Sequence, residues 1–196
     1  TRLISPLFLP HLRRKILLHG PFGSGKTLVA LLTAKKAIKN GWTVIYMPPT
    51  DKRGAGVMEI GLQLARKYQP AVFIIEDIDH EQRVEDPYTF RQLLANMDGV
   101  ISKGAKIIVV MTSNSIDKIG GPLLRPGRID QLIKLERFEA DETSKLIQKH
   151  IPGSRLSGDI NWEKVHQASL GYPPAFIVGL AESAILQAVE SGADEV

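Results

Sequence analysis

The hydrophobic and polar positions divide the chain into two unlike parts. In the first part, short apolar runs without alternation are separated by stretches with helical spacing. Continuous apolar runs between helices are typical of a parallel sheet that helices cover on both faces, which predicts an α/β domain. The predicted strands are residues 15–19, 43–47, 71–75, 106–111 and 131–135, and the predicted helices are residues 28–39, 56–67 and 87–97.

The first predicted helix is expected to carry an apolar face with lysines on the opposite side. The apolar face comprises Leu28, Leu31, Leu32 and Ile38, and the lysines are Lys35, Lys36 and Lys39.

The second part of the chain has helical spacing throughout. Helices are predicted over residues 141–150, 161–169 and 174–190, with Asp141 and Asn161 as caps of the first two. We therefore expect an α/β domain at residues 1–137 and a small all-helical lid at residues 138–196.

Composition narrows the function classes. With 43% hydrophobic and 23% charged residues, the chain of 196 residues is unlike a disordered protein. It contains no cysteine, which excludes disulfides and thiolate metal sites and fits a cytoplasmic or other reducing compartment. Its apolar runs are shorter than the roughly 18 residues of a membrane span, so no membrane partner is expected.

Charge is distributed unevenly between the two parts. Residues 1–137 hold 21 basic and 12 acidic side chains, whereas residues 138–196 hold 4 and 9. The net charge of +4 therefore combines a domain at +9 with a lid at −5. This pattern indicates an anionic partner for the first domain.

A glycine-rich segment follows the first predicted strand. Residues 20–27 read GPFGSGKT, which fits the phosphate-binding pattern G-x-x-x-x-G-K-[ST] between a strand and a helix. Lys26 is expected to reach the β- and γ-phosphates of ATP, and the Thr27 hydroxyl to ligate Mg²⁺. The predicted nucleotide contacts in this segment are Pro21, Phe22, Gly23, Ser24, Gly25, Lys26, Thr27 and Leu28.

Two adjacent carboxylates end the third predicted strand. Glu76 and Asp77 come directly after an apolar run, where a parallel sheet holds its ligands. Because successive side chains point to opposite sides, one carboxylate can serve the metal while the other faces the attacking water. A capping or salt-bridge cluster is the alternative interpretation.

Together with these motifs, an ordered set of further segments resembles the AAA proteins, within the wider AAA+ ATPases. The resemblance spans residues 15 to 190, about nine-tenths of the chain, and implies a ring-forming ATP hydrolase that binds ATP or ADP with Mg²⁺. The further segments are residues 90–99, 107–114, 123–130, 145–150 and 171–175.

The resemblance also implies roles for single residues. Asn114 would orient the lytic water as a sensor, and Arg125 and Arg128 would act on the nucleotide of a neighbouring subunit. Hydrolysis would then need a homo-oligomeric, hexameric ring. His150 would contact the nucleotide sugar, and Ala175 would contribute backbone near the adenine and phosphates. The alternatives are that Arg128 only braces the interface and that His150 is an exposed helix end.

The sequence departs from the family pattern at two informative places. The family usually has Asp before Glu, whereas this chain has Glu76 before Asp77. If position fixes role, Glu76 serves Mg²⁺ and Asp77 is the base, with roughly 1.5 Å less reach than Glu. Either hydrolysis is slow or the backbone compensates. In the family, a loop between the second and third strands carries an aromatic residue that grips substrate in the pore of the ring. Here this segment has no aromatic residue and contains Lys52 and Arg53, which either bind an acidic chain or nucleic acid or form a solvated turn.

The leading hypothesis is an ATP-driven motor that remodels a protein or protein complex. The basic first domain and its Lys52-Arg53 loop keep open a nucleic-acid motor or loader. The reversed acidic pair keeps open an assembly switch that binds ATP and hydrolyses it weakly.

Overall fold

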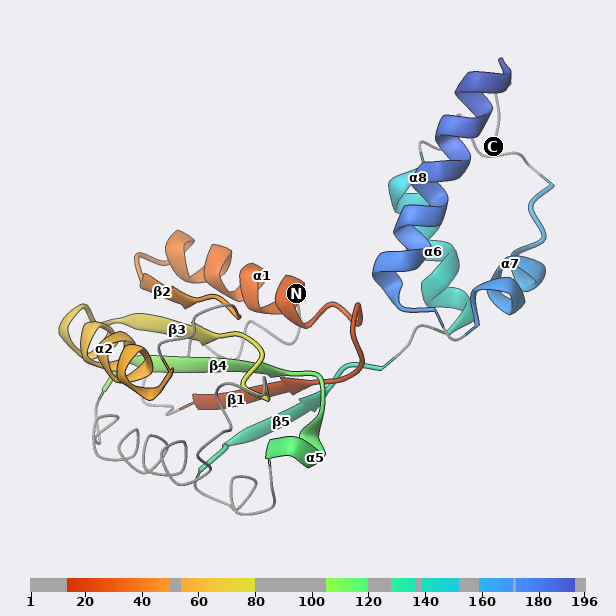
Figure 1. Ribbon diagram of the computed structural model, residues 1–196. Helices are drawn as coiled ribbons and strands as arrows, with labels where there is room; N and C mark the ends of the chain where they lie inside the picture. Colours follow the sequence, from red (N-terminus) through yellow and green to blue (C-terminus); the bar gives the residue numbers. More distant parts are fainter. Residues whose placement is uncertain are drawn as a thin grey trace. The chain divides into compact units, whose positions relative to one another are not determined.

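The computed structural model describes residues 14–49, 54–79, 105–119, 128–136, 139–151, 159–170 and 172–192 (Figure 1). Contacts divide the chain into an α/β unit, residues 1–20 and 26–135, and a helical unit, residues 21–25 and 136–196. The predicted helix at residues 87–97, the loop with Lys52 and Arg53, and Arg125 lie outside the described residues.

The α/β unit contains a sheet of five parallel strands in the order β2-β3-β4-β1-β5 (Figure 1). The predicted α/β fold with a parallel sheet is thereby confirmed, and the strand ends differ from those predicted by at most two residues. The strands are β1 (Arg14–His19), β2 (Thr43–Met47), β3 (Ala71–Ile75), β4 (Ile107–Ser113) and β5 (Gln131–Lys134).

The strand register brings three functional segments to one edge of the sheet. In β3 and β4, Ile75 lies opposite Met111, and in β1 and β4, His19 lies opposite Ser113. Because these strands are parallel neighbours, their carboxyl ends meet. The glycine-rich segment, the acidic pair and the predicted sensor therefore follow three adjacent strand ends.

Helices cover both faces of the sheet, as predicted. Side chains of α1 (Lys26–Lys39) share one core with Ile16 and Leu18, whereas side chains of α2 (Gly54–Lys67) share the other core with Leu17 (Figure 1). Adjacent residues of β1 thus point into different cores, as the pleat of a strand requires.

The predicted inner face of α1 is wrong. Ala30, Ala34 and Ala37 are buried against the sheet, while Leu28 is 60% exposed and the other three predicted apolar positions are exposed as well. The lysines do not lie opposite them, because Lys35 follows Leu28 by seven residues and so occupies the same helix face. The buried residues of α1, Lys26, Ala30, Thr33, Ala34 and Ala37, are mostly small.

The helical unit contains α6 (Ala140–His150), α7 (Trp162–Ser169) and α8 (Pro174–Ser191). Asn161 caps α7 as predicted, since its Oδ1 accepts from the Lys164 N–H at 3.0 Å. The predicted cap at Asp141 is wrong, because α6 begins one residue earlier and its cap is Glu139. Asp141 instead pairs with Lys145 within the first turn and a half.

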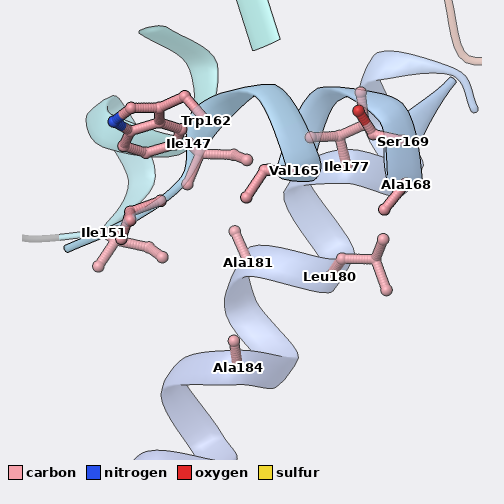
Figure 2. Close-up of a pocket in the computed structure, with 11 residues that line it drawn as sticks. Ile147, Ile151, Trp162, Val165, Ala168, Ser169, Ile177, Leu180, Ala181 and Ala184 are labelled. Carbon is pink, nitrogen blue, oxygen red and sulfur yellow. The ribbon is translucent and has the colours of Figure 1, made fainter. Parts of the chain in front are cut away.

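An apolar cavity of about 330 Å³ lies among the three helices of this unit (Figure 2). Ile147 of α6, Val165 of α7 and Ala181 of α8 are among the side chains that line it. Its lining includes none of the predicted nucleotide contacts, so it is a gap between packed helices and not a predicted nucleotide site. In the described parts of the chain, no helix is long and apolar enough to cross a membrane.

Candidate nucleotide-hydrolysis site

The glycine-rich segment connects the end of β1 to the start of α1. Gly23 and Gly25 have φ angles of 74° and 92°, a left-handed region that glycine enters without steric cost. Lys26, the first residue of α1, is buried and donates from Nζ to the Gly20 carbonyl oxygen at 2.9 Å. Burial lowers the pKa of Lys26, and the nearby Asp77, Asp79 and Glu76 carboxylates oppose that shift.

The centre of the segment packs within the helical unit. The Ala175 N–H donates to the Gly23 carbonyl oxygen at 3.4 Å. A Cβ atom on Gly23 would lie 2.6 Å from the Cβ of Pro173, which is too close for a side chain. Two residues predicted separately as nucleotide contacts, Gly23 and Ala175, are therefore direct neighbours.

A hydroxyl and a carboxylate meet beside the start of α1. Thr27 donates from Oγ1 to Glu76 Oε2 at 2.7 Å, and Glu76 is only 3% exposed. Both are hard oxygen donors, the type that Mg²⁺ prefers, and Mg²⁺ usually takes few protein ligands beside phosphate and water. This donor pair fits a magnesium ion that also binds a nucleotide phosphate.

Asp77 has an unusual backbone conformation directly after Glu76. Its φ of 47° lies in the left-handed region, which is unfavourable for a residue with a Cβ atom but more tolerated by Asp. Its Oδ1 accepts from Asn114 Nδ2 at 2.9 Å. The structure thus brings the second predicted carboxylate and the predicted sensor into direct contact.

Sequence reasoning missed two residues that hold this pair. Thr112 Oγ1 accepts from the Asp77 N–H at 2.9 Å, and Asp79 accepts from the N–H groups of Asn114 and Ser115 at 3.0–3.2 Å. The signal available in the sequence was a polar residue, Thr112, at the end of an otherwise apolar run. Its partner could not be identified without the register of β3 and β4.

Two further ionisable side chains lie close to these groups. Burial is the main cause that lowers the pKa of His19, and Lys134 and Lys26 add to it. Desolvation of the covered part of Tyr46, which is 44% exposed, raises the pKa of this side chain, with the Glu76 and Asp77 carboxylates contributing. At neutral pH both side chains are therefore neutral.

Arg128, His150 and Phe22 are three further predicted site residues. Arg128 lies in the turn before β5, and next to it Asp130 binds the start of β1. The Asp130 N–H donates to the Lys15 carbonyl oxygen at 2.9 Å, and Asp130 Oδ2 accepts from the Lys15 N–H at 2.8 Å. His150 is exposed at the end of α6, where its Nδ1 lies 2.9 Å from the Leu146 carbonyl oxygen. Phe22 is also exposed.

Comparison with known proteins decides the family. The family model described as "ATPase family associated with various cellular activities (AAA)" matches residues 16–137. The chain belongs to the AAA family. It is accordingly a P-loop ATP hydrolase domain that binds ATP.

Curated relatives of this AAA domain share about 30% of its sequence. An "ATP-dependent zinc metalloprotease FtsH" of Mycoplasmopsis pulmonis is 31% identical over 92% of this chain and 27% of that protein. Proteins of the same name from Helicobacter pylori and Acidimicrobium ferrooxidans are 29% and 31% identical over 92% of this chain. The chain spans less than a third of the length of these relatives.

Proposed function

We propose that this AAA domain is the Mg-ATP-dependent motor of a ring that remodels proteins. The observation that carries the proposal is the contact of Asn114 with Asp77, next to the Thr27–Glu76 pair. A donor, a carboxylate and a metal-type oxygen pair at one sheet edge are the groups that phosphoryl transfer needs.

The two parts of the chain would have separate tasks. Residues 1–137 would form the ATPase domain, and residues 138–196 would form its helical lid. The division of contacts at residues 135–136 supports a boundary close to this one, while residues 21–25 group with the helical unit. Gly23 of the glycine-rich segment contacts Ala175 within the helical unit, so a nucleotide bound by this segment would also act on that unit. His150 is proposed as the lid's contact with the nucleotide sugar.

Lys26 and the backbone of residues 21–28 would bind the triphosphate. Lys26 would exchange the Gly20 carbonyl for the β- and γ-phosphates, because a protonated ammonium group binds an anion more strongly than a neutral carbonyl. Thr27 and Glu76 would hold Mg²⁺, and when bound the ion would neutralise phosphate charge. Because Glu76 is buried, its carboxylate stays close to Thr27.

Asp77 would act as the general base and Asn114 as the sensor. Asp77 would accept the proton of the water that attacks the γ-phosphorus. Asn114 has a second N–H on the same amide, which could donate to a phosphate oxygen while Asp77 is still bound. Their 2.9 Å contact supports a shared role.

Arg125 and Arg128 are proposed to complete the site of a neighbouring subunit. Arginine suits developing phosphoryl charge because its guanidinium group makes paired hydrogen bonds. The test mixes two inactive variants, Lys26→Ala, which keeps both arginines, and Arg125→Ala, which keeps its phosphate loop. Recovery of ATP hydrolysis on mixing is expected for arginines that act between subunits. Mixing without recovery, together with turnover independent of protein concentration, would contradict the ring.

A polypeptide is the proposed substrate. The relatives' names join dependence on ATP to proteolysis, which supports handling of protein chains. The charge of +9 on residues 1–137 is the observation that favours the second candidate, a nucleic-acid motor. The test compares ATP turnover with an unfolded protein and with single-stranded DNA. Stimulation by the protein alone is expected, and stimulation by DNA alone would favour the second candidate.

A further inference from the structure

Thr112 binds the backbone N–H groups on both sides of the Asp77 α-carbon. Its Oγ1 accepts from the Asp77 N–H at 2.9 Å, and its carbonyl oxygen accepts from the Ile78 N–H at 2.9 Å. Thr112 is completely buried in β4. One side chain and one carbonyl of the same residue thus hold two consecutive peptide groups that follow β3.

These two hydrogen bonds act where the backbone turns. The last register pair of β3 and β4 is Ile75 with Met111, so the Asp77 N–H lies past the regular ladder. There the φ of Asp77 is 47°, a conformation that costs roughly 1–2 kcal/mol for a residue with a Cβ atom. Such a conformation persists only when its surroundings hold it.

The turn decides where the Asp77 carboxylate points. In a continuing strand its side chain would simply alternate with that of Glu76. The turned backbone instead directs Oδ1 to Asn114 Nδ2. Asp79 completes the arrangement from the other side, because it accepts from the N–H groups of Asn114 and Ser115. Thr112 of β4 thus holds the segment after β3, and Asp79 after β3 holds the segment after β4.

We propose that Thr112 is a positioning residue that sets the direction of the Asp77 carboxylate through the Asp77 backbone. The inference rests on the proposed role of Asp77 as the base. The side chain of Asp77 is one methylene shorter than that of Glu and can adjust its reach less. The backbone of Asp77 must therefore be placed accurately. Displacement of a catalytic group by about 1 Å can reduce a rate about 100-fold.

The test compares three variants of the full chain. Thr112→Val keeps the shape and removes the acceptor, whereas Thr112→Ser keeps the acceptor and loses a methyl group. Thr33→Val is the matched control, because Thr33 is also buried and its hydroxyl donates to the Val29 carbonyl oxygen within α1. For each variant the kcat and KM of ATP hydrolysis, the affinity for ATP and the Tm are measured.

We expect kcat to fall at least about tenfold in Thr112→Val, with KM and ATP affinity within about twofold of the wild type. Thr112→Ser should recover most of the lost kcat, and Thr33→Val should lower Tm without lowering kcat. In an Asp77→Asn background, Thr112→Val should add no further loss, since the two act through one group.

Unchanged kcat in Thr112→Val would overturn the inference, as would a loss in Thr112→Ser as large as that in Thr112→Val. If Thr112→Val does not fold, Thr112→Cys replaces it, with a similar size and a weak sulfur acceptor, and unchanged kcat would again overturn the inference. Full activity of Asp77→Asn would instead contradict the proposed function. Loss in Asp77→Asn with none in Thr112→Val would contradict only the role of Thr112.

Discussion

The side-chain amide of Asn114 donates to the carboxylate of Asp77, with Nδ2 2.9 Å from Oδ1. The two residues are 37 positions apart and follow adjacent parallel strands. This hydrogen bond joins the proposed sensor of the γ-phosphate to the proposed general base.

Substitution Asn114→Ala should reduce kcat about 100-fold, because it removes a preorganised donor at the reacting centre. ATP affinity should change much less, since the proposed phosphate grip is formed by Lys26 and the loop backbone. Steady-state hydrolysis and equilibrium ATP binding measure the two effects. Asn40→Ala is the control, because Asn40 is exposed and its side-chain amide donates to the Lys36 carbonyl oxygen. An equal loss in both variants would argue against a sensor.

Substitution Glu76→Gln should raise the Mg²⁺ concentration needed for half-maximal hydrolysis at least about tenfold, because it removes the negative charge that faces Thr27. Titration of activity with Mg²⁺ at fixed ATP measures this shift. Glu59→Gln, on the exposed face of α2, is the control. A Glu76→Gln variant with an unchanged Mg²⁺ requirement would remove Glu76 from the proposed metal site.

Two glycines within helices should respond to alanine in opposite directions. A Cβ atom on Gly61 of α2 would lie 2.5 Å from Phe73 Cζ, so Gly61→Ala should destabilise the protein by about 1–3 kcal/mol. Gly179 of α8 has open space, so Gly179→Ala should stabilise its helix by about 0.5–1 kcal/mol. Urea unfolding followed by circular dichroism measures both. Equal effects of the two substitutions would contradict the close packing of α2 on β3.

His19 should titrate below its ordinary pKa of 6.5, mainly because it is partly buried and also because Lys134 and Lys26 are near. The unfolded chain then binds the proton more readily than the folded one, so the free energy of unfolding should decrease as pH falls below 6.5. Ring NMR shifts measure the pKa. Lys134→Gln should raise this pKa, whereas Lys35→Gln should leave it unchanged. A His19 pKa at or above 6.5 would contradict the described surroundings.

Much of the fold could be predicted from local sequence because buried parallel strands are continuous apolar runs. The run at 71–75 matches β3 at both ends, and the glycine-rich segment lies between β1 and α1 as expected. The inner face of α1 differs from the predicted one because the large apolar side chains of this helix are exposed and its small residues face the sheet. The face that packs on the sheet is formed by Ala30, Ala34 and Ala37.

The site was only partly predictable for a different reason. Glu76 and Asp77 could be found from their place after an apolar run, but their partners depend on register. Only the pairing of β3 with β4 places Thr112 next to the Asp77 N–H. Likewise, the left-handed backbone at Asp77 has no signal in the residue types around it.

The most direct test of the assignment is single-turnover ATP hydrolysis by Asp77→Asn, measured beside its affinity for Mg-ATP. Asparagine keeps the size of the side chain and removes its capacity to accept the proton. The account predicts Mg-ATP affinity within about twofold of the wild type and hydrolysis reduced at least about 100-fold. Hydrolysis at the wild-type rate would contradict the role of Asp77 as the base.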